Sequence, residues 1–148
     1  MKYFTTSWWE SGCKDADQLF SAYDDHLKKI ETHISSQLLE LYRSHTLHDS
    51  EVKNVACFFD EKNLVIELLG WDIDLQFPVR YKLTFIDVEY FQQKLPQQTY
   101  VESELGDLGY WELDFVSGKT EMRILFVSHA EFSVRFSDFT FTHEKEKA

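Results

Sequence analysis

Three residues near the end of the first third of the chain, His45, His48 and Asp49, carry side chains that can transfer protons or bind a metal ion. Such chemistry needs imidazole and carboxylate groups that converge from several elements. A structural interpretation is also available, because a helix end favours His and because Asp49-Ser50 suits a turn before a strand. We favour the structural interpretation and keep a polar site at these three residues as the alternative.

Other residues with reactive side chains lack the partners that catalysis requires. Glu112 and Asp114 alternate along a strand, and we expect them to be solvated charges on its wet face. Ser128-His129 has no flanking glycines to form a nucleophile turn, and the chain has no glycine-rich phosphate loop. The sequence therefore predicts a protein without catalytic activity, metal site or cofactor.

Composition and charge limit the class of protein and its partners. The chain has 148 residues, 43% of them apolar, which suits one domain (1–148) with a real core. The formal net charge of −11 disfavours nucleic acid and favours a basic protein partner. No leader or membrane-spanning run is evident, so we expect a cytoplasmic, reduced protein, with Cys57 as a small core residue.

Two predicted connections combine aromatic and acidic side chains, a composition typical of protein interfaces. One follows a predicted strand and the other lies in a long stretch without clear periodicity. The predicted partner-binding residues are Trp71, Asp72 and Asp74 in the first connection and Tyr100, Glu102, Glu104 and Asp107 in the second. An equally good structural interpretation of Trp71 is that it caps the end of a strand.

A long helix is the first element that the pattern predicts. Asp15, followed three residues later by Gln18, resembles a helix-capping pair after the N-terminal segment 1–12. Apolar residues then recur every three or four positions, which predicts one helix over 15–44 with a single apolar stripe. The residues of this stripe are Leu19, Phe20, Tyr23, Leu27, Ile30, Ile34, Leu38 and Leu41.

The second half of the chain alternates with the period of a strand. Odd positions from Val79 to Phe85 are apolar and even positions are polar, and Phe132–Phe136 repeats this pattern. A phase shift at Ser137-Asp138 indicates a β-bulge. We therefore predict an α+β fold in which one antiparallel sheet of six to seven strands spans 51–141. The long helix packs on one face of this sheet, and the tail 143–148 frays.

Several short motifs resemble an uncharacterised bacterial family of unknown function. They are the opening Met1-Lys2-Tyr3-Phe4-Thr5, the turn Leu47-His48-Asp49-Ser50 and the strands at 110–112 and 123–126. The Leu-His-Asp pattern in a small acidic α+β protein is also similar to immunity proteins of bacterial toxin systems.

These observations predict a non-enzymatic, acidic, protein-binding module, with neutralisation of a basic toxin as one specific role. The alternative is a small-molecule-binding protein or hydrolase, with a pocket between helix and sheet near His48 and Asp49. A homodimer through an exposed sheet face or edge is a third interpretation.

Overall fold

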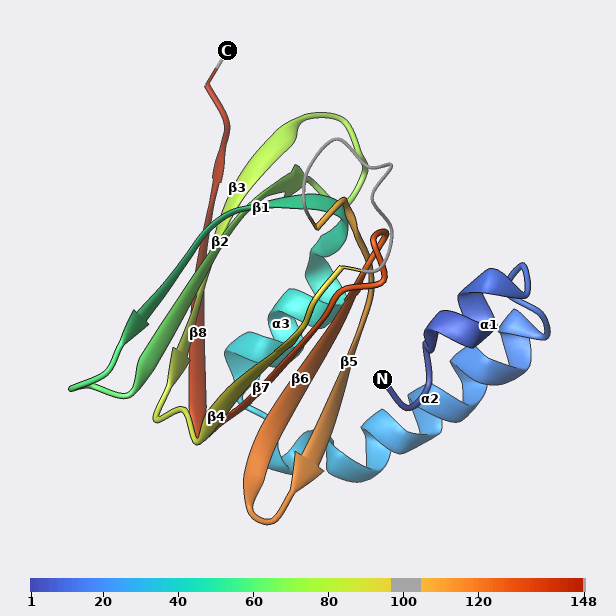
Figure 1. Ribbon diagram of the computed structural model, residues 1–148, viewed down its shortest axis with the longest axis horizontal. Helices are drawn as coiled ribbons and strands as arrows, with labels where there is room; N and C mark the ends of the chain where they lie inside the picture. Colours follow the sequence, from blue (N-terminus) through green and yellow to red (C-terminus); the bar gives the residue numbers. More distant parts are fainter. Residues whose placement is uncertain (97–104, 148) are drawn as a thin grey trace.

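The computed structural model describes residues 1–96 and 105–147. Within these ranges, four helical segments come first and eight antiparallel strands follow (Figure 1). The helical segments are α1 (Thr6–Glu10), α2 (Ala16–Ile30), the single 3₁₀ turn η1 (Glu31–His33) and α3 (Ser36–Ser44). The strands are β1 (Thr46–Phe58), β2 (Asn63–Trp71), β3 (Pro78–Ile86), β4 (Tyr90–Lys94), β5 (Leu108–Val116), β6 (Lys119–Phe126), β7 (Glu131–Phe136) and β8 (Asp138–Lys145).

The strands form two sheets of four, which corrects the prediction of one sheet with six to seven strands. The first sheet has the order β1-β2-β3-β8 and the second has the order β4-β7-β6-β5. Both chain crossings between the sheets are sharp. Asp87, with φ 55°, separates β3 from β4, and Ser137 separates β7 from β8. The phase shift at Ser137 thus marks a passage between sheets, where the sequence predicted a bulge within one.

The alternation that predicts the strands is confirmed where it is regular. In β3 the side chains of Val79, Tyr81, Leu83 and Phe85 are buried, and the polar residues between them are exposed or half-buried. Strand β7 buries Phe132, Val134 and Phe136 in the same way. Both sets point into one core because the two sheets face each other across it.

The single helix predicted over 15–44 is also wrong, because the chain breaks at Ile34. This residue is extended (φ −94°, ψ 139°), and the Ser35 hydroxyl then accepts a hydrogen bond from the Leu38 amide at 3.2 Å. A serine in this position starts a new helix. The apolar stripe is therefore divided between two helices: Tyr23 and Leu27 are buried from α2, and Leu38 and Leu41 from α3.

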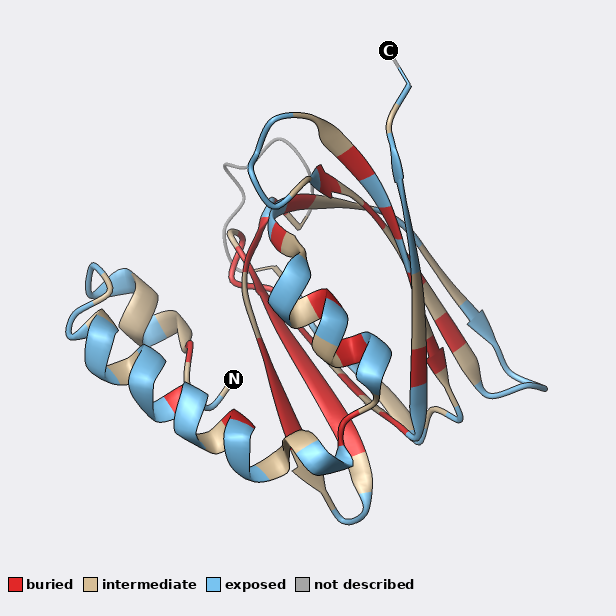
Figure 2. Cartoon of the chain, turned by 180° about the vertical axis from the view of Figure 1, so that it is seen from behind, coloured by how far each residue is buried: buried red, intermediate tan, exposed pale blue. Residues whose placement is uncertain are grey.

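Helix α3 lies across the opening between the two sheets (Figure 2). Leu38 and Leu41 are fully buried there and belong to one cluster with side chains of both sheets. Helices α1 and α2 instead lie outside the second sheet, next to β5 (Figure 1). No helix in the described part of the chain is long and apolar enough to cross a membrane.

Three smaller predictions also fail. Asp15 is in the left-handed region (φ 55°) and makes no capping hydrogen bond, although α2 does start at Ala16. Cys57 is exposed, not in the core, because β1 is the outer strand of its sheet. Strand β8 continues through Lys145, and the Glu146 amide donates to the Pro78 carbonyl, so part of the tail predicted to fray is paired with β3.

Candidate functional site

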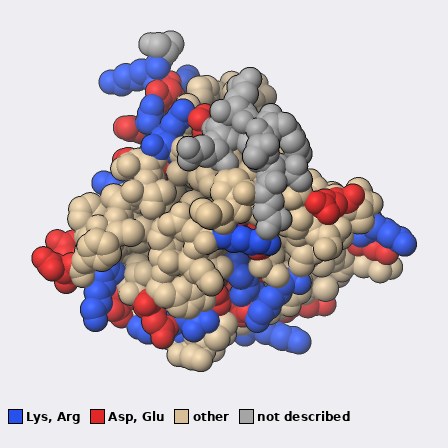
Figure 3. Space-filling view, viewed as in Figure 1, with Lys and Arg blue, Asp and Glu red and all other residues tan. Residues whose placement is uncertain are grey.

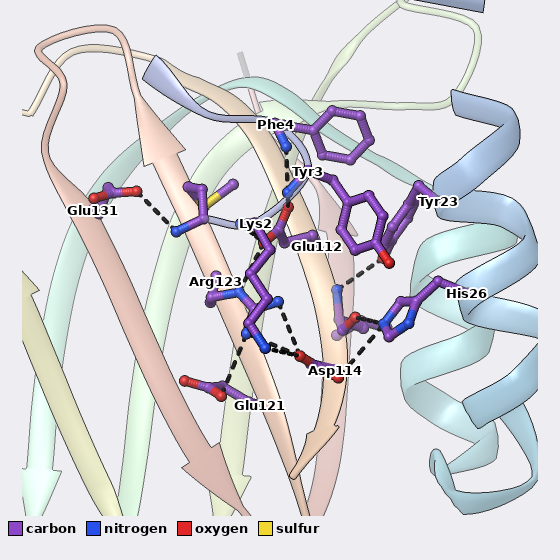
Figure 4. Close-up of polar contacts among 12 residues, drawn as sticks. Lys2, Tyr3, Phe4, Tyr23, His26, Glu112, Asp114, Glu121, Arg123 and Glu131 are labelled. Carbon is purple, nitrogen blue, oxygen red and sulfur yellow. Dashed lines mark hydrogen bonds and ion pairs between the residues drawn. The ribbon is translucent and has the colours of Figure 1, made fainter. Parts of the chain in front are cut away.

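A fully buried carboxylate on the outer face of the second sheet holds the N-terminal segment. Glu112, in β5, accepts hydrogen bonds from the amides of Lys2, Tyr3 and Phe4 at 2.5, 2.9 and 3.1 Å (Figure 4). The Arg123 Nε donates to the same carboxylate at 2.8 Å. A buried charge is tolerated when it is paired and hydrogen-bonded in this way.

Arg123 is the centre of a wider network of charges. Its guanidinium lies 3.2 Å from Asp114 Oδ2 and 3.4 Å from Glu121 Oε2, in addition to its contact with Glu112. Arg135 reaches Glu121 at 3.4 Å, and the Lys2 Nζ reaches Asp114 at 3.1 Å. All three carboxylates are 9% exposed or less, so the sequence-based expectation of solvated charges at Glu112 and Asp114 is wrong.

The electrostatics of this network favour the charged forms of Glu112, Asp114 and Arg123. Burial by itself raises the pKa of Glu112, but the hydrogen bonds from the Lys2 amide and Arg123 outweigh it, and the pKa lies below its ordinary value. Burial also raises the pKa of Asp114, but the hydrogen bonds from the Phe115 amide and Lys2 outweigh it, so the pKa lies below its ordinary value. For Arg123, the three carboxylates overcome desolvation and raise the pKa.

Two side chains of α2 bind the outer edge of β5. The Leu113 amide donates to the Tyr23 hydroxyl at 2.8 Å, and the His26 Nε2 lies 3.1 Å from the Leu113 carbonyl. His26 Nε2 is also 3.5 Å from Asp114, and Figure 4 shows both rings pointing at the strand. A helix thus satisfies backbone groups that an edge strand otherwise leaves open.

The charged network stabilises the fold. The pKa values of Glu112 and Asp114 are lowered and both carboxylates are already occupied by donors, so neither is poised to move a proton at neutral pH. The N-terminal segment also covers Glu112 completely. We conclude that these residues hold the N-terminal segment and α2 on the second sheet, and that working surfaces must be sought elsewhere.

One predicted binding connection is a tight loop between β2 and β3. The Asp72 carboxylate accepts hydrogen bonds from the amides of Gln76 and Phe77 at 2.5 and 2.9 Å. Partial desolvation raises the pKa of Asp72, but these amides outweigh it and lower the pKa. Asp72 therefore fixes the loop, whereas the Asp74 carboxylate makes no ion pair within the described residues.

The same loop exposes three large apolar side chains, which we call the 71–75 loop surface. Trp71, Ile73 and Leu75 are 38, 52 and 57% exposed. Leu75 also has φ 58°, a conformation that is unusual for a bulky side chain. The sequence prediction contained Trp71 but missed Ile73 and Leu75, although the alternation of apolar and acidic residues in Trp71–Leu75 could have indicated them.

Of the three residues of the predicted polar site, His48 and Asp49 contact each other, whereas His45 packs among other aromatic rings. His45 packs its ring against Tyr81 and His143, and burial followed by the charge of His143 lowers its pKa. His48 instead lies beside β5, where its Nδ1 is 2.9 Å from the Gly109 carbonyl. Asp49, at φ 61°, contacts the His48 Nε2 at 3.4 Å.

Of the second predicted connection, Tyr100, Glu102 and Glu104 lie outside the described residues. Asp107 is exposed and close to His48 and Asp49. Its pKa is raised by desolvation, then by the charges of Asp49 and Glu51, and His48 opposes this shift. The structure therefore brings one predicted binding residue next to part of the predicted polar site.

A second exposed apolar group occupies the tip of the β1–β2 hairpin. Phe58 and Phe59 are 48 and 86% exposed, and together with Asp60 and Glu61 they line a shallow hollow. Figure 3 shows acidic side chains at this end of the molecule and basic ones gathered over the second sheet. No binding role was predicted for these residues from the sequence.

Comparison with known proteins found no matching protein-family model, no matching curated protein and no matching solved structure. The resemblance to the bacterial family and to immunity proteins therefore stays a prediction. Within the described ranges 1–96 and 105–147, no three His, Cys, Asp or Glu side chains gather closely enough to hold a metal ion.

Proposed function

We propose that the chain is a non-enzymatic protein-binding module that docks a basic partner on the 71–75 loop surface. The observation that carries the proposal is the exposure of Ile73 and Leu75 on a loop that the Asp72 carboxylate holds in one conformation. Exposed apolar side chains in a fixed arrangement supply binding energy with little ordering cost.

The preference for a basic partner follows from charge. The net charge of −11 attracts a cationic protein over a distance, and Asp74 lies within the loop without an ion pair among the described residues. Such charges mainly increase the rate of association and fix the orientation of the partner. Added salt should therefore slow association, while the apolar contacts remain.

The experiment is affinity capture from cells that express the protein naturally, followed by identification of the retained proteins. The test variant carries Ile73→Ser and Leu75→Asn, since asparagine tolerates the left-handed conformation of position 75. The control is Phe59→Ser, which removes an even more exposed apolar side chain at the hairpin tip. We expect a basic protein on the wild type and the control that is absent from the loop variant. Equal retention on all three, or no retained protein, contradicts the proposal.

Neutralisation of a basic toxin is the specific form of this function that the sequence resemblance implies. Support for it comes from the acidic charge and from the apolar loop, which together suit a cationic enzyme as partner. Co-expression with the captured protein tests this role: the wild type should restore growth of cells that the captured protein inhibits, and the loop variant should not.

A small-molecule or hydrolytic site near His48 is a second candidate. It is favoured by one observation: the Gly109 carbonyl accepts a hydrogen bond from His48 Nδ1, so that Nε2 faces Asp49 at 3.4 Å, with Asp107 nearby. The variant His48→Ala/Asp49→Ala separates the candidates. A small molecule that binds the wild type and the loop variant but not this variant would favour the site at His48, and unchanged ligand binding and stability in this variant would remove it.

A further inference from the structure

Two imidazole side chains meet at the rim of the core, where α3 ends beside β8. His45 follows the last residue of α3 and His143 lies in β8, and the centres of their rings are 4.5 Å apart. The Gln37 side chain of α3 accepts a hydrogen bond from the Phe141 amide of β8 at 3.2 Å. The two histidines therefore come from separate elements that are tied to each other.

Aromatic side chains lie behind these two rings. The His45 ring makes T-shaped contacts with Tyr81 and Phe141, with ring centres 5.8 and 5.3 Å apart. His143 continues the face of β8 that is turned to the core, where Phe139 is buried, Phe141 is half-buried and His143 itself is exposed. The pair of imidazoles thus has aromatic neighbours on one side and solvent on the other.

The ring nitrogens of this pair are available to a ligand. Neither imidazole takes part in a hydrogen bond or an ion pair within the described part of the chain. Other histidines are bound to the backbone: His48 lies at hydrogen-bonding distance from the Gly109 carbonyl and His26 from the Leu113 carbonyl. A neutral imidazole whose nitrogens are available can give a lone pair to a metal ion.

The spacing of the rings is that of two ligands on one metal ion. Zinc binds imidazole nitrogen at about 2.0–2.1 Å, which places the centres of two rings on one ion roughly 4.5–5.5 Å apart. The planes of the two rings are tilted by 55°, so the rings are not stacked on each other. We propose that His45 and His143 bind a divalent transition-metal ion that prefers imidazole ligands, such as Ni²⁺, Cu²⁺ or Zn²⁺, with water in the remaining positions.

The charge around the pair suits a cation. Glu40 of α3 lies close enough for its charge to act on the imidazole of His45, and the whole chain has a net charge of −11. An ion held by both rings joins the end of α3 to β8, so its binding stabilises the folded chain. This proposal goes beyond the function proposed above and does not rest on it.

Calorimetric titration of the full chain with Ni²⁺ tests the proposal. We expect one site whose affinity falls at least about tenfold in His45→Ala and in His143→Ala, because loss of a residue that only supports a metal ligand already costs that much. His48→Ala is the matched control: it removes an exposed imidazole beside a carboxylate and should leave Ni²⁺ binding unchanged. Excess Mg²⁺ should not compete, since it prefers oxygen ligands.

Thermal unfolding gives a second readout and also shows whether each variant folds. The melting temperature of the wild type and of His48→Ala should rise with added Ni²⁺, whereas that of His143→Ala, changed at an exposed position, should not. Absence of Ni²⁺ binding up to about 1 mM overturns the proposal. Binding that Mg²⁺ displaces, or that keeps its full strength in His45→Ala and His143→Ala, overturns it equally.

Discussion

The hydroxyl of Tyr23 accepts a hydrogen bond from the Leu113 amide at 2.8 Å, and this contact joins α2 to the edge of the second sheet. Tyr23 is 1% exposed, and burial raises the pKa of its phenol well above the ordinary value. The side chain is therefore neutral at any physiological pH and acts only as a hydrogen-bonding group.

Removal of this hydroxyl tests its contribution to stability. Tyr23→Phe leaves the Leu113 amide without its acceptor in a buried place, which should cost about 1–3 kcal/mol of the free energy of unfolding. Tyr42→Phe is the matched control, because the Tyr42 hydroxyl makes no hydrogen bond within the described residues. Chemical denaturation of both variants measures the difference, and equal stabilities would show that the edge contact contributes nothing.

Glu112 should be among the least replaceable polar residues of the chain. Glu112→Ala leaves Arg123 with one carboxylate fewer and three backbone amides without an acceptor. Loss of one partner from a buried ion pair lowers the free energy of unfolding by about 3–5 kcal/mol. Glu61→Ala, at the exposed hairpin tip, should change the free energy of unfolding by less than about 0.5 kcal/mol. Urea titrations compare the two, and a wild-type midpoint for Glu112→Ala would contradict the network described above.

The same network predicts loss of stability in acid. The pKa values of Glu112 and Asp114 are lower in the folded chain than their ordinary values of 4.5 and 3.8. A carboxyl group with a depressed pKa contributes stability above its unfolded pKa, and this contribution is lost as the pH falls through the folded pKa. The melting temperature should therefore fall below pH 4.5. The melting temperature of Glu112→Gln should fall less steeply with pH than that of the wild type. Parallel curves for the variant and the wild type would contradict this role of Glu112.

His45 provides an independent check on the first sheet. Burial and the charge of His143 lower the pKa of His45, so the folded chain prefers the neutral imidazole. Proton NMR titration should give a pKa for His45 below 6.5, and His143→Ala should bring it closer to that value. An unchanged pKa in the variant would mean that the two rings do not interact.

The sequence predicts those parts of the fold in which the local pattern of apolar and polar residues alone decides which side chains are buried. Alternation in Val79–Phe85 identifies the buried face of β3 because both neighbouring strands simply continue the sheet. The same alternation misled at Glu112 and Asp114. Their face is covered by residues 1–4, more than a hundred positions away, and a local pattern contains no information about that contact.

The missed breaks have a similar explanation. Ile34 continues the apolar spacing of a helix, so periodicity alone cannot show that the chain stops and restarts at Ser35. The turns at Asp87 and Ser137 carry the chain between sheets, and their geometry depends on how those sheets pack. For the candidate site, the position of Trp71 beside Asp72 and Asp74 in the sequence was enough to predict it as a binding residue. The structural role of Asp72 needed the coordinates of its amide donors.

The central claim is that the charged network supports the fold while the 71–75 loop surface binds a partner. The most direct test measures melting temperature and partner capture on the same two variants, Glu112→Gln and Ile73→Ser/Leu75→Asn. We predict that Glu112→Gln melts lower but still captures the partner while it is folded, and that the loop variant melts like the wild type and captures none. A loop variant that captures the partner normally, or a Glu112→Gln variant that loses capture at full stability, would contradict the claim.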